Sequence, residues 1–293
     1  MRAFEYREPD NLEEVLSLLH DHGEDAKIIA GGTALVIMLN QRLIMPSYLI
    51  SLRKLPGLNS VESVGGALQL GALVTHREME ISPVIRDQIP VLAETYRQVA
   101  TLRIRNMATV GGTLAHADPS QDSPVTLMAL DARVGLTSSG GSREVALDEF
   151  FTDYYETVLQ PDELLTHVQV PLPKAHTGSI YLKFLPRTED DYATVGVAAS
   201  VEIEPSSRLC RECRIVLGGV APTPLRVKEA EALLSGQKLA PELLHKAASV
   251  VQEHTDPISD SRGGADYKRE MAGVCVRRAL EQAWQRAFSR DDA

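Results

Sequence analysis

The sequence predicts an α+β fold in three parts, on three observations. Residues 1–56 alternate strand and helix patterns, which favours a small parallel sheet. Residues 57–176 begin with a hairpin pattern and continue with mixed helices and strands, and residues 177–293 place three apolar strands before a run of helices. We therefore expect a small parallel α/β part, a larger mixed α/β part and a C-terminal α+β domain with a three-stranded antiparallel sheet.

The first part opens with an amphipathic helix. Apolar residues from Leu12 to Leu19 recur at helical spacing, and Asp10 followed by Glu13 is typical of a capping box. The part is then expected to continue with a buried strand at residues 27–30, a tight turn at 31–33, a helix at 34–42 and a strand at 48–52.

The second part starts after Pro56 and Gly57. The Gly65-Gly66 pair between two apolar runs predicts a β-hairpin. Further along we expect helices at residues 75–81, 90–100 and 124–130, strands up to residue 170 and a linker at 171–173. The third part is expected to hold strands at residues 180–185, 194–203 and 213–220 and helices at 228–234, 241–254 and 265–288.

Net charge and cysteine content limit the functions that are expected of this chain. The formal net charge is −10, and non-specific binding to nucleic acid or to an anionic membrane needs a basic surface, so neither is expected. No apolar stretch approaches the roughly 20 residues that cross a bilayer, and the N-terminus lacks the apolar run of a signal peptide, so we expect a cytoplasmic protein. The 3 cysteines are too few for a disulfide framework or for the four-cysteine set of an iron–sulfur cluster.

Two Gly-Gly-Thr sequences, each after apolar residues, are the clearest functional signal. They stand at residues 31–33 and 111–113. Adjacent glycines let the backbone approach a ligand closely and aim successive N–H groups at one point, and the threonine hydroxyl adds a hydrogen-bond donor. This geometry suits a pyrophosphate, and a helix starting directly after the first copy would favour the anion further.

A tight turn without a ligand is the alternative interpretation of one such pair, because Gly-Gly commonly punctuates strands. Two matched copies favour a binding role. Neither copy is G-x-x-x-x-G-K-[ST] or G-x-G-x-x-G, so neither a P-loop nucleotidase nor a Rossmann dinucleotide fold is supported. A different dinucleotide-binding fold is expected.

Residues 102–124, LRIRNMATVGGTLAHADPSQDSP, resemble the FAD-binding loop of the flavoprotein subunits of molybdenum hydroxylases. This family includes carbon monoxide dehydrogenase medium subunits and the FAD domain of xanthine dehydrogenase. Three further segments agree in order: residues 27–35 resemble the family's first pyrophosphate loop, residues 181–195 its flavin-proximal hairpin and residues 261–283 its C-terminal helix. The resemblance covers essentially the whole chain and implies that the first two parts form a two-part FAD-binding domain.

The resemblance implies FAD contacts at the positions that match the family's motifs, with no catalytic side chain and no metal ligand. These positions are Ile28, Ile29, Ala30, Gly31, Gly32, Thr33, Ala34, Leu35, Val99, Thr109, Val110, Gly111, Gly112, Thr113, Asp122, Leu165, Lys183 and Tyr192. Ala34 and Thr113 depart from the family, which often has a polar residue at the first position and Asn at the second, so only backbone contacts are implied there.

The resemblance also assigns roles to single side chains outside the two glycine turns. Asp122 is expected to accept hydrogen bonds from the ribose or a flavin edge, and Leu165 to make apolar contact. Lys183, near the pyrimidine end of the flavin, would stabilise the negative charge of the reduced form. Tyr192 would stack on the isoalloxazine or gate access to it.

The resemblance further implies partners: a small subunit with [2Fe-2S] clusters and a large molybdopterin subunit, in a heterotrimer that is doubled. Electrons would pass from the clusters to FAD and then to NAD, a quinone, oxygen or a carrier protein. Residues 189–191, Glu-Asp-Asp, are either a solvated charge run or a control on acceptor access.

Two other functions stay open from the sequence. One is a stand-alone FAD-dependent oxidoreductase, which needs a substrate pocket with its own base. The other is a scaffold subunit that has lost FAD, against which the intact glycine pairs and Lys183 speak.

Overall fold

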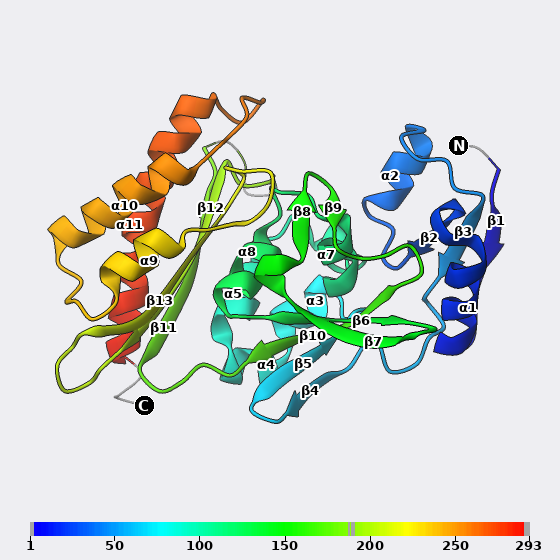
Figure 1. Cartoon of the computed structure of the whole chain (residues 1–293), viewed down its shortest axis with the longest axis horizontal. Coiled ribbons are helices and arrows are strands. Elements are labelled where there is room, and N and C mark those ends of the chain that lie inside the picture. Colours follow the sequence, from blue (N-terminus) through cyan, green and yellow to red (C-terminus); the bar gives the residue numbers. More distant parts are fainter. Residues whose placement is uncertain (1–2, 187, 189–190, 290–293) are drawn as a thin grey trace.

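The computed structural model describes residues 3–289 except 187, 189 and 190. The described strands form three larger sheets, taken from three successive stretches of the chain, and one two-stranded hairpin. We name these stretches the N-terminal unit (residues 5–51), the middle unit (61–171) and the C-terminal unit (177–289). Figure 1 shows them in this order along the long axis of the molecule, with the middle unit between the other two.

The N-terminal unit is a parallel sheet of order β1-β3-β2, as expected. Its first helix is capped by Asn11, whose side chain accepts a hydrogen bond from the N–H of Glu14 at 2.9 Å, so Asp10 is not the cap. The elements are β1 (Glu5–Arg7), α1 (Leu12–His22), a 3₁₀ turn (Gly23–Asp25), β2 (Ala26–Ile29), α2 (Leu35–Asn40) and β3 (Tyr48–Ser51).

The middle unit contains a five-stranded sheet of order β4-β5-β10-β6-β7, in which every neighbouring pair is antiparallel. The predicted hairpin at Gly65-Gly66 forms one edge. The strands are β4 (Val61–Val64), β5 (Ala67–Gly71), β6 (Arg133–Ser138), β7 (Gly141–Ala146) and β10 (Leu164–Pro171), with β8 (Phe151–Asp153) and β9 (Glu156–Thr157) in the separate hairpin.

Short helices complete the middle unit, and two of them, α5 and α8, pack against the C-terminal sheet. The sequence predicts three of them, and the structure adds others because prolines and threonine caps divide the segment into short turns. The helices are α3 (His76–Ile81), α4 (Pro83–Gln88), α5 (Pro90–Arg97), α6 (Leu102–Arg105), α7 (Val110–His116) and α8 (Asp122–Ala129).

The C-terminal unit is an antiparallel sheet with helices on its outer face (Figure 1). The sheet has four strands rather than the predicted three, because the two-residue strand β14 pairs with β13. None of the described helices combines the length and the apolar character that a membrane span requires. The elements are β11 (Thr177–Phe184), β12 (Val195–Ile203), β13 (Cys210–Gly218), β14 (Leu225–Arg226), α9 (Lys228–Leu234), α10 (Pro241–His254) and α11 (Ala265–Ser289).

The hydrophobic core of the middle unit extends into the C-terminal sheet. Tyr181, Ala198 and Val216, which come from β11, β12 and β13, belong to the same buried cluster as the residues of α5 and α8. The inner face of the C-terminal sheet is therefore covered by the middle unit, and burial of this shared surface holds the two units together.

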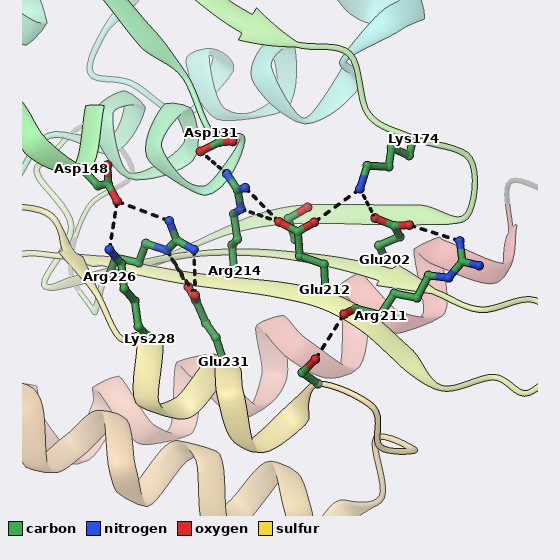
Figure 2. A network of polar contacts seen from close by, with 12 residues as sticks. Asp131, Asp148, Lys174, Glu202, Arg211, Glu212, Arg214, Arg226, Lys228 and Glu231 are labelled. Atoms are coloured by element: carbon green, nitrogen blue, oxygen red, sulfur yellow. Dashed lines mark hydrogen bonds and ion pairs between the residues drawn. The ribbon is translucent and has the colours of Figure 1, made fainter. Parts of the chain in front are cut away.

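A network of charged side chains joins the same two units at the edge of their interface (Figure 2). Arg214 pairs with Asp131 of the middle unit, and Arg226 contacts both Asp148 at 3.4 Å and Glu231 at 2.9 Å. Glu231 is buried and also accepts a hydrogen bond from the N–H of Ile215 at 2.9 Å. Glu231 thus satisfies both a buried backbone donor and the arginine that reaches across the interface.

We expect Glu231→Ala to lower the free energy of unfolding by about 3 kcal/mol, because it removes the nearer of the two carboxylates that Arg226 contacts and leaves the buried N–H of Ile215 without an acceptor. Urea unfolding followed by circular dichroism measures this change. Glu229→Ala is the control, since Glu229 lies on the same helix with its side chain 64% exposed. Equal effects of the two substitutions would contradict the assigned role of Glu231.

Candidate FAD site

A cavity of about 730 Å³ lies where the N-terminal and middle units meet. Its walls come from β2 and the loop before α2, from α7, and from the β8–β9 hairpin with the segment that follows it. Ligand pockets in proteins have volumes of roughly 300 to 1,000 Å³, so the cavity has the size of a binding site for a large organic ligand.

The first Gly-Gly-Thr sequence forms an open loop on the cavity wall. Gly32 has φ +72°, a left-handed conformation that favours glycine. Within the described part of the chain, the backbone N–H groups from Gly31 to Ala34 have no protein acceptor. The loop is half-buried, so its N–H groups stay open to solvent or to a ligand in the cavity, and a pyrophosphate supplies acceptors for them.

The close approach of two backbones fixes the position of this loop. A Cβ atom at Gly31 would lie 1.7 Å from the carbonyl oxygen of Met107, which precedes α7. Only glycine allows the loop to lie this close to the middle unit. The glycine at position 31 therefore serves the contact between two units, in addition to any ligand.

The second Gly-Gly-Thr sequence is not a turn, contrary to the expectation from the sequence. It forms the first turn of α7, capped by the side chain of Thr109. The N–H of Gly111 donates to Ala72 at 2.9 Å, that of Gly112 to Thr109 Oγ1 at 3.1 Å, and that of Thr113 to the carbonyl of Thr109 at 3.0 Å. The two copies are thus not equivalent, because the donors of the second copy are used inside the protein.

Twelve of the expected contact positions line the cavity, and six do not. The twelve are Ile28, Ala30, Gly31, Gly32, Thr33, Ala34, Leu35, Thr109, Gly111, Gly112, Thr113 and Leu165. The six are Ile29, Val99, Val110, Asp122, Lys183 and Tyr192.

Asp122 and Lys183 are paired with each other rather than open to a ligand. Lys183 Nζ lies 2.9 Å from Asp122 Oδ2 and 2.9 Å from the carbonyl oxygen of Gln98, and both charged side chains are 3% exposed. The hydroxyl of Tyr181 donates to Asp122 Oδ1 at 2.5 Å. Burial raises the pKa of Asp122, and the Lys183 ammonium and the Tyr181 hydroxyl act against this rise.

This pairing changes what the two residues are able to do. Both oxygens of Asp122 already accept hydrogen bonds, and the positive charge of Lys183 is neutralised at contact distance. The two residues therefore form a neutral pair, and their expected contacts with FAD stay predictions. Gln121, which precedes Asp122, lines the cavity, so the pair is joined through the chain to a residue of the cavity wall.

Tyr192 lies at the edge of the C-terminal unit. Its ring faces the guanidinium of Arg262, 5.2 Å from the ring centroid, and Arg262 also pairs with Asp191 at 3.0 Å. Burial, with the nearby Asp118 and Tyr155, raises the pKa of Tyr192 to about 12. Tyr192 is thus near the β8–β9 hairpin but outside the cavity wall. Residues 189 and 190 of the acidic run lie outside the described residues.

The sequence did not indicate the wall formed by the β8–β9 hairpin. Tyr155, with φ +59°, lines the cavity and donates from its hydroxyl to Asp118 Oδ2 at 3.2 Å, and His116 packs against its ring. A positive φ at a tyrosine is uncommon in any protein and marks this residue once the structure is known. No local sequence pattern predicted that Tyr155 would line the cavity.

The residues present fit FAD at the first loop. Free N–H donors, two glycines and a large cavity that continues to the apolar Leu165 match a ligand with a pyrophosphate and a ring system. At the second copy the small residues allow close approach, but their N–H groups are not available.

We expect Lys183→Met to lower the free energy of unfolding by about 3 kcal/mol in the flavin-free chain, because Asp122 stays buried without its cation. Adding Asp122→Asn should recover most of this loss, since the amide carries no charge. Thermal and urea unfolding of the four proteins of this cycle measure the coupling. Lys228→Met is the control, because it replaces an exposed lysine. If the effects of Lys183→Met and Asp122→Asn on stability were purely additive, the two residues would not act as a pair.

We expect Gly32→Ala to weaken FAD binding at least tenfold, because a side chain at positive φ strains the loop and turns its N–H groups away. Gly66→Ala is a matched control: Gly66 has φ +84° in a remote hairpin with open space around it, so it carries a similar strain without touching the cavity. Equilibrium dialysis gives both dissociation constants, and equal weakening would mean that the first loop holds no ligand.

Known proteins resemble the chain over almost its whole length. The family "FAD binding domain in molybdopterin dehydrogenase" matches residues 2–173, and "CO dehydrogenase flavoprotein C-terminal domain" matches residues 180–283. The carbon monoxide dehydrogenase medium chain of Hydrogenophaga pseudoflava is 36% identical over 97% of this chain and 98% of its own length. Subunit alpha of the 6-hydroxypseudooxynicotine dehydrogenase complex of Paenarthrobacter nicotinovorans is 35% identical over 97% of this chain and 96% of its own.

A solved structure agrees with the fold. Carbon monoxide dehydrogenase from Hydrogenophaga pseudoflava, in a form that lacks the Mo-pyranopterin moiety, superposes with a TM-score of 0.94 at 37% identity, covering 97% of this chain and 98% of the matched chain. Sequence, fold and the cavity between the two glycine segments lead to the same assignment: the chain belongs to the FAD-binding medium subunits of the molybdenum hydroxylase family of oxidoreductases.

Proposed function

We propose that this chain takes electrons from [2Fe-2S] clusters of a small partner subunit and passes them through bound FAD to an external acceptor. The complex would also contain a large molybdopterin subunit, in a heterotrimer that is doubled. FAD, when bound, supplies a centre that accepts electrons one at a time and releases them in pairs. The observation that carries the proposal is the loop from Gly31 to Ala34, whose free N–H groups face a cavity of suitable size.

The role of this chain's residues in the proposal is to bind and position the cofactor. The first loop would hold the pyrophosphate, and the small residues of α7 would let it lie against the middle unit. Leu165 supplies an apolar wall. The Asp122 and Lys183 pair would hold the base of the site in one arrangement without adding net charge.

The cysteines of the chain support a partner that carries the clusters. Cys210, Cys213 and Cys275 are free thiols that belong to the hydrophobic core of the C-terminal unit, where they pack against valine, leucine and alanine side chains. Packing in this core is enough to explain the three cysteines. Similar relatives carry the names of different substrates, carbon monoxide and 6-hydroxypseudooxynicotine, which supports placing substrate choice in another subunit.

The test is to co-express the chain with candidate iron–sulfur and molybdopterin chains encoded by neighbouring genes and to isolate the complex. Rapid mixing of the FAD-loaded chain with the reduced iron–sulfur subunit should bleach the flavin absorbance. A FAD-loaded chain that oxidises a substrate without partners would favour a stand-alone oxidoreductase, and a complex whose medium chain carries no FAD would favour a scaffold. Either result would contradict the proposal.

A further inference from the structure

His76 is a buried histidine held firmly against the start of α7. It is the first residue of α3 and is 3% exposed. Its backbone N–H donates to the carbonyl of Ala108 at 2.9 Å, and the preceding Thr75 forms a β-bridge with Thr109. The ring packs edge-on against Tyr96, with 4.9 Å between centroids. Two backbone contacts and one aromatic contact therefore fix where the imidazole lies.

The imidazole contacts a residue of the cavity wall. His76 Nε2 lies 2.8 Å from Thr113 Oγ1, and Thr113 lines the cavity. Burial lowers the pKa of His76 to about 4; the backbone of Thr109 opposes this shift, and the positive charge of Arg105 reinforces it. At neutral pH the ring is therefore uncharged and carries one N–H.

The surroundings of the ring select the nitrogen that carries this hydrogen. Nδ1 is buried and has no hydrogen-bond partner among the described residues, and a buried N–H without an acceptor is rarer in proteins than a buried acceptor without a donor. The hydrogen is thus on Nε2, which lies against Thr113 Oγ1. Thr113 Oγ1 then accepts from His76 and keeps its own hydrogen for another acceptor.

We propose that His76 is a positioning residue that turns the Thr113 hydroxyl into a hydrogen-bond donor toward bound FAD. The acceptor would be an oxygen of the pyrophosphate or of the ribityl chain. Among the described residues this hydroxyl makes no hydrogen bond other than the one with His76, and Thr113 borders the cavity beside Gly112. This inference rests on FAD binding as set out under the proposed function. It gives Thr113 a side-chain role at a position whose backbone N–H is already used.

The test compares FAD dissociation constants of the full-length, flavin-free chain by equilibrium dialysis, with thermal unfolding recorded for each protein. Thr113→Val keeps the shape and removes the hydroxyl, and we expect about five- to tenfold weaker binding. Thr113→Ser keeps the hydroxyl and should bind within about threefold of the unchanged chain. The serine variant separates loss of the hydrogen bond from loss of packing.

Two variants of His76 provide a matched pair. The amide nitrogen of glutamine is as many bonds from Cα as Nε2, so His76→Gln retains a donor to Thr113, whereas the shorter His76→Asn does not reach it. We expect binding close to that of the unchanged chain for His76→Gln and about fivefold weaker binding for His76→Asn. In a chain that already carries Thr113→Val, His76→Asn should weaken FAD binding almost no further, because both changes remove the same interaction.

The outcomes separate this inference from the proposed function. If the unchanged chain binds no FAD, the proposed function fails and the inference fails with it. If the unchanged chain binds FAD and Thr113→Val binds equally well, only the inference fails. Coupling between His76 and Thr113 that occurs in thermal stability but not in FAD affinity would likewise overturn it, because the hydrogen bond would then serve the fold alone.

Discussion

The contact between the backbone at Gly31 and the carbonyl group of Met107 shapes the site more than any side chain does. A Cβ atom at position 31 would lie 1.7 Å from this oxygen, so only glycine lets the N-terminal unit lie so close to α7. The free N–H groups of the loop and the small residues of α7 face the same space as a result. Without this contact the two glycine segments, eighty residues apart, would not share a cavity.

A second constraint lies behind the cavity, where the C-terminal unit meets the middle unit. Tyr181 belongs by sequence to β11 but by packing to the core of the middle unit, and its hydroxyl bonds to Asp122 at the start of α8. Lys183, two residues along the same strand, reaches the same carboxylate. The C-terminal sheet is thereby tied to the start of α8, next to Gln121 of the cavity wall. The charge network of Figure 2 joins the same two units through Arg214 of β13 and Arg226 of β14.

Much of this architecture could be predicted from the sequence. The three predicted strands of the C-terminal unit are apolar runs, α10 and α11 are long, and the first Gly-Gly-Thr turn has the residue types that a positive φ requires. The domain limits proposed from the sequence, at residues 56 and 176, stay predictions.

The second Gly-Gly-Thr sequence could not be predicted in the same way. Glycines usually end helices, whereas here the Thr109 cap and two bonds to residues 72 and 74 start one. The pairing of charged side chains could not be predicted from the sequence either. The carboxylate of Asp122 and the ammonium of Lys183 are 61 residues apart in sequence, and nothing local to either residue shows that they neutralise each other. The same holds for His76, which the sequence did not mark and which packing brings to Thr113.

The flavin content of the purified chain tests the central claim most directly. The protein is purified, saturated with FAD and freed of excess cofactor; its absorbance spectrum is recorded, and the material released by heat is identified. The account predicts flavin absorbance and close to one FAD per chain. A colourless chain that does not take up added FAD would contradict it.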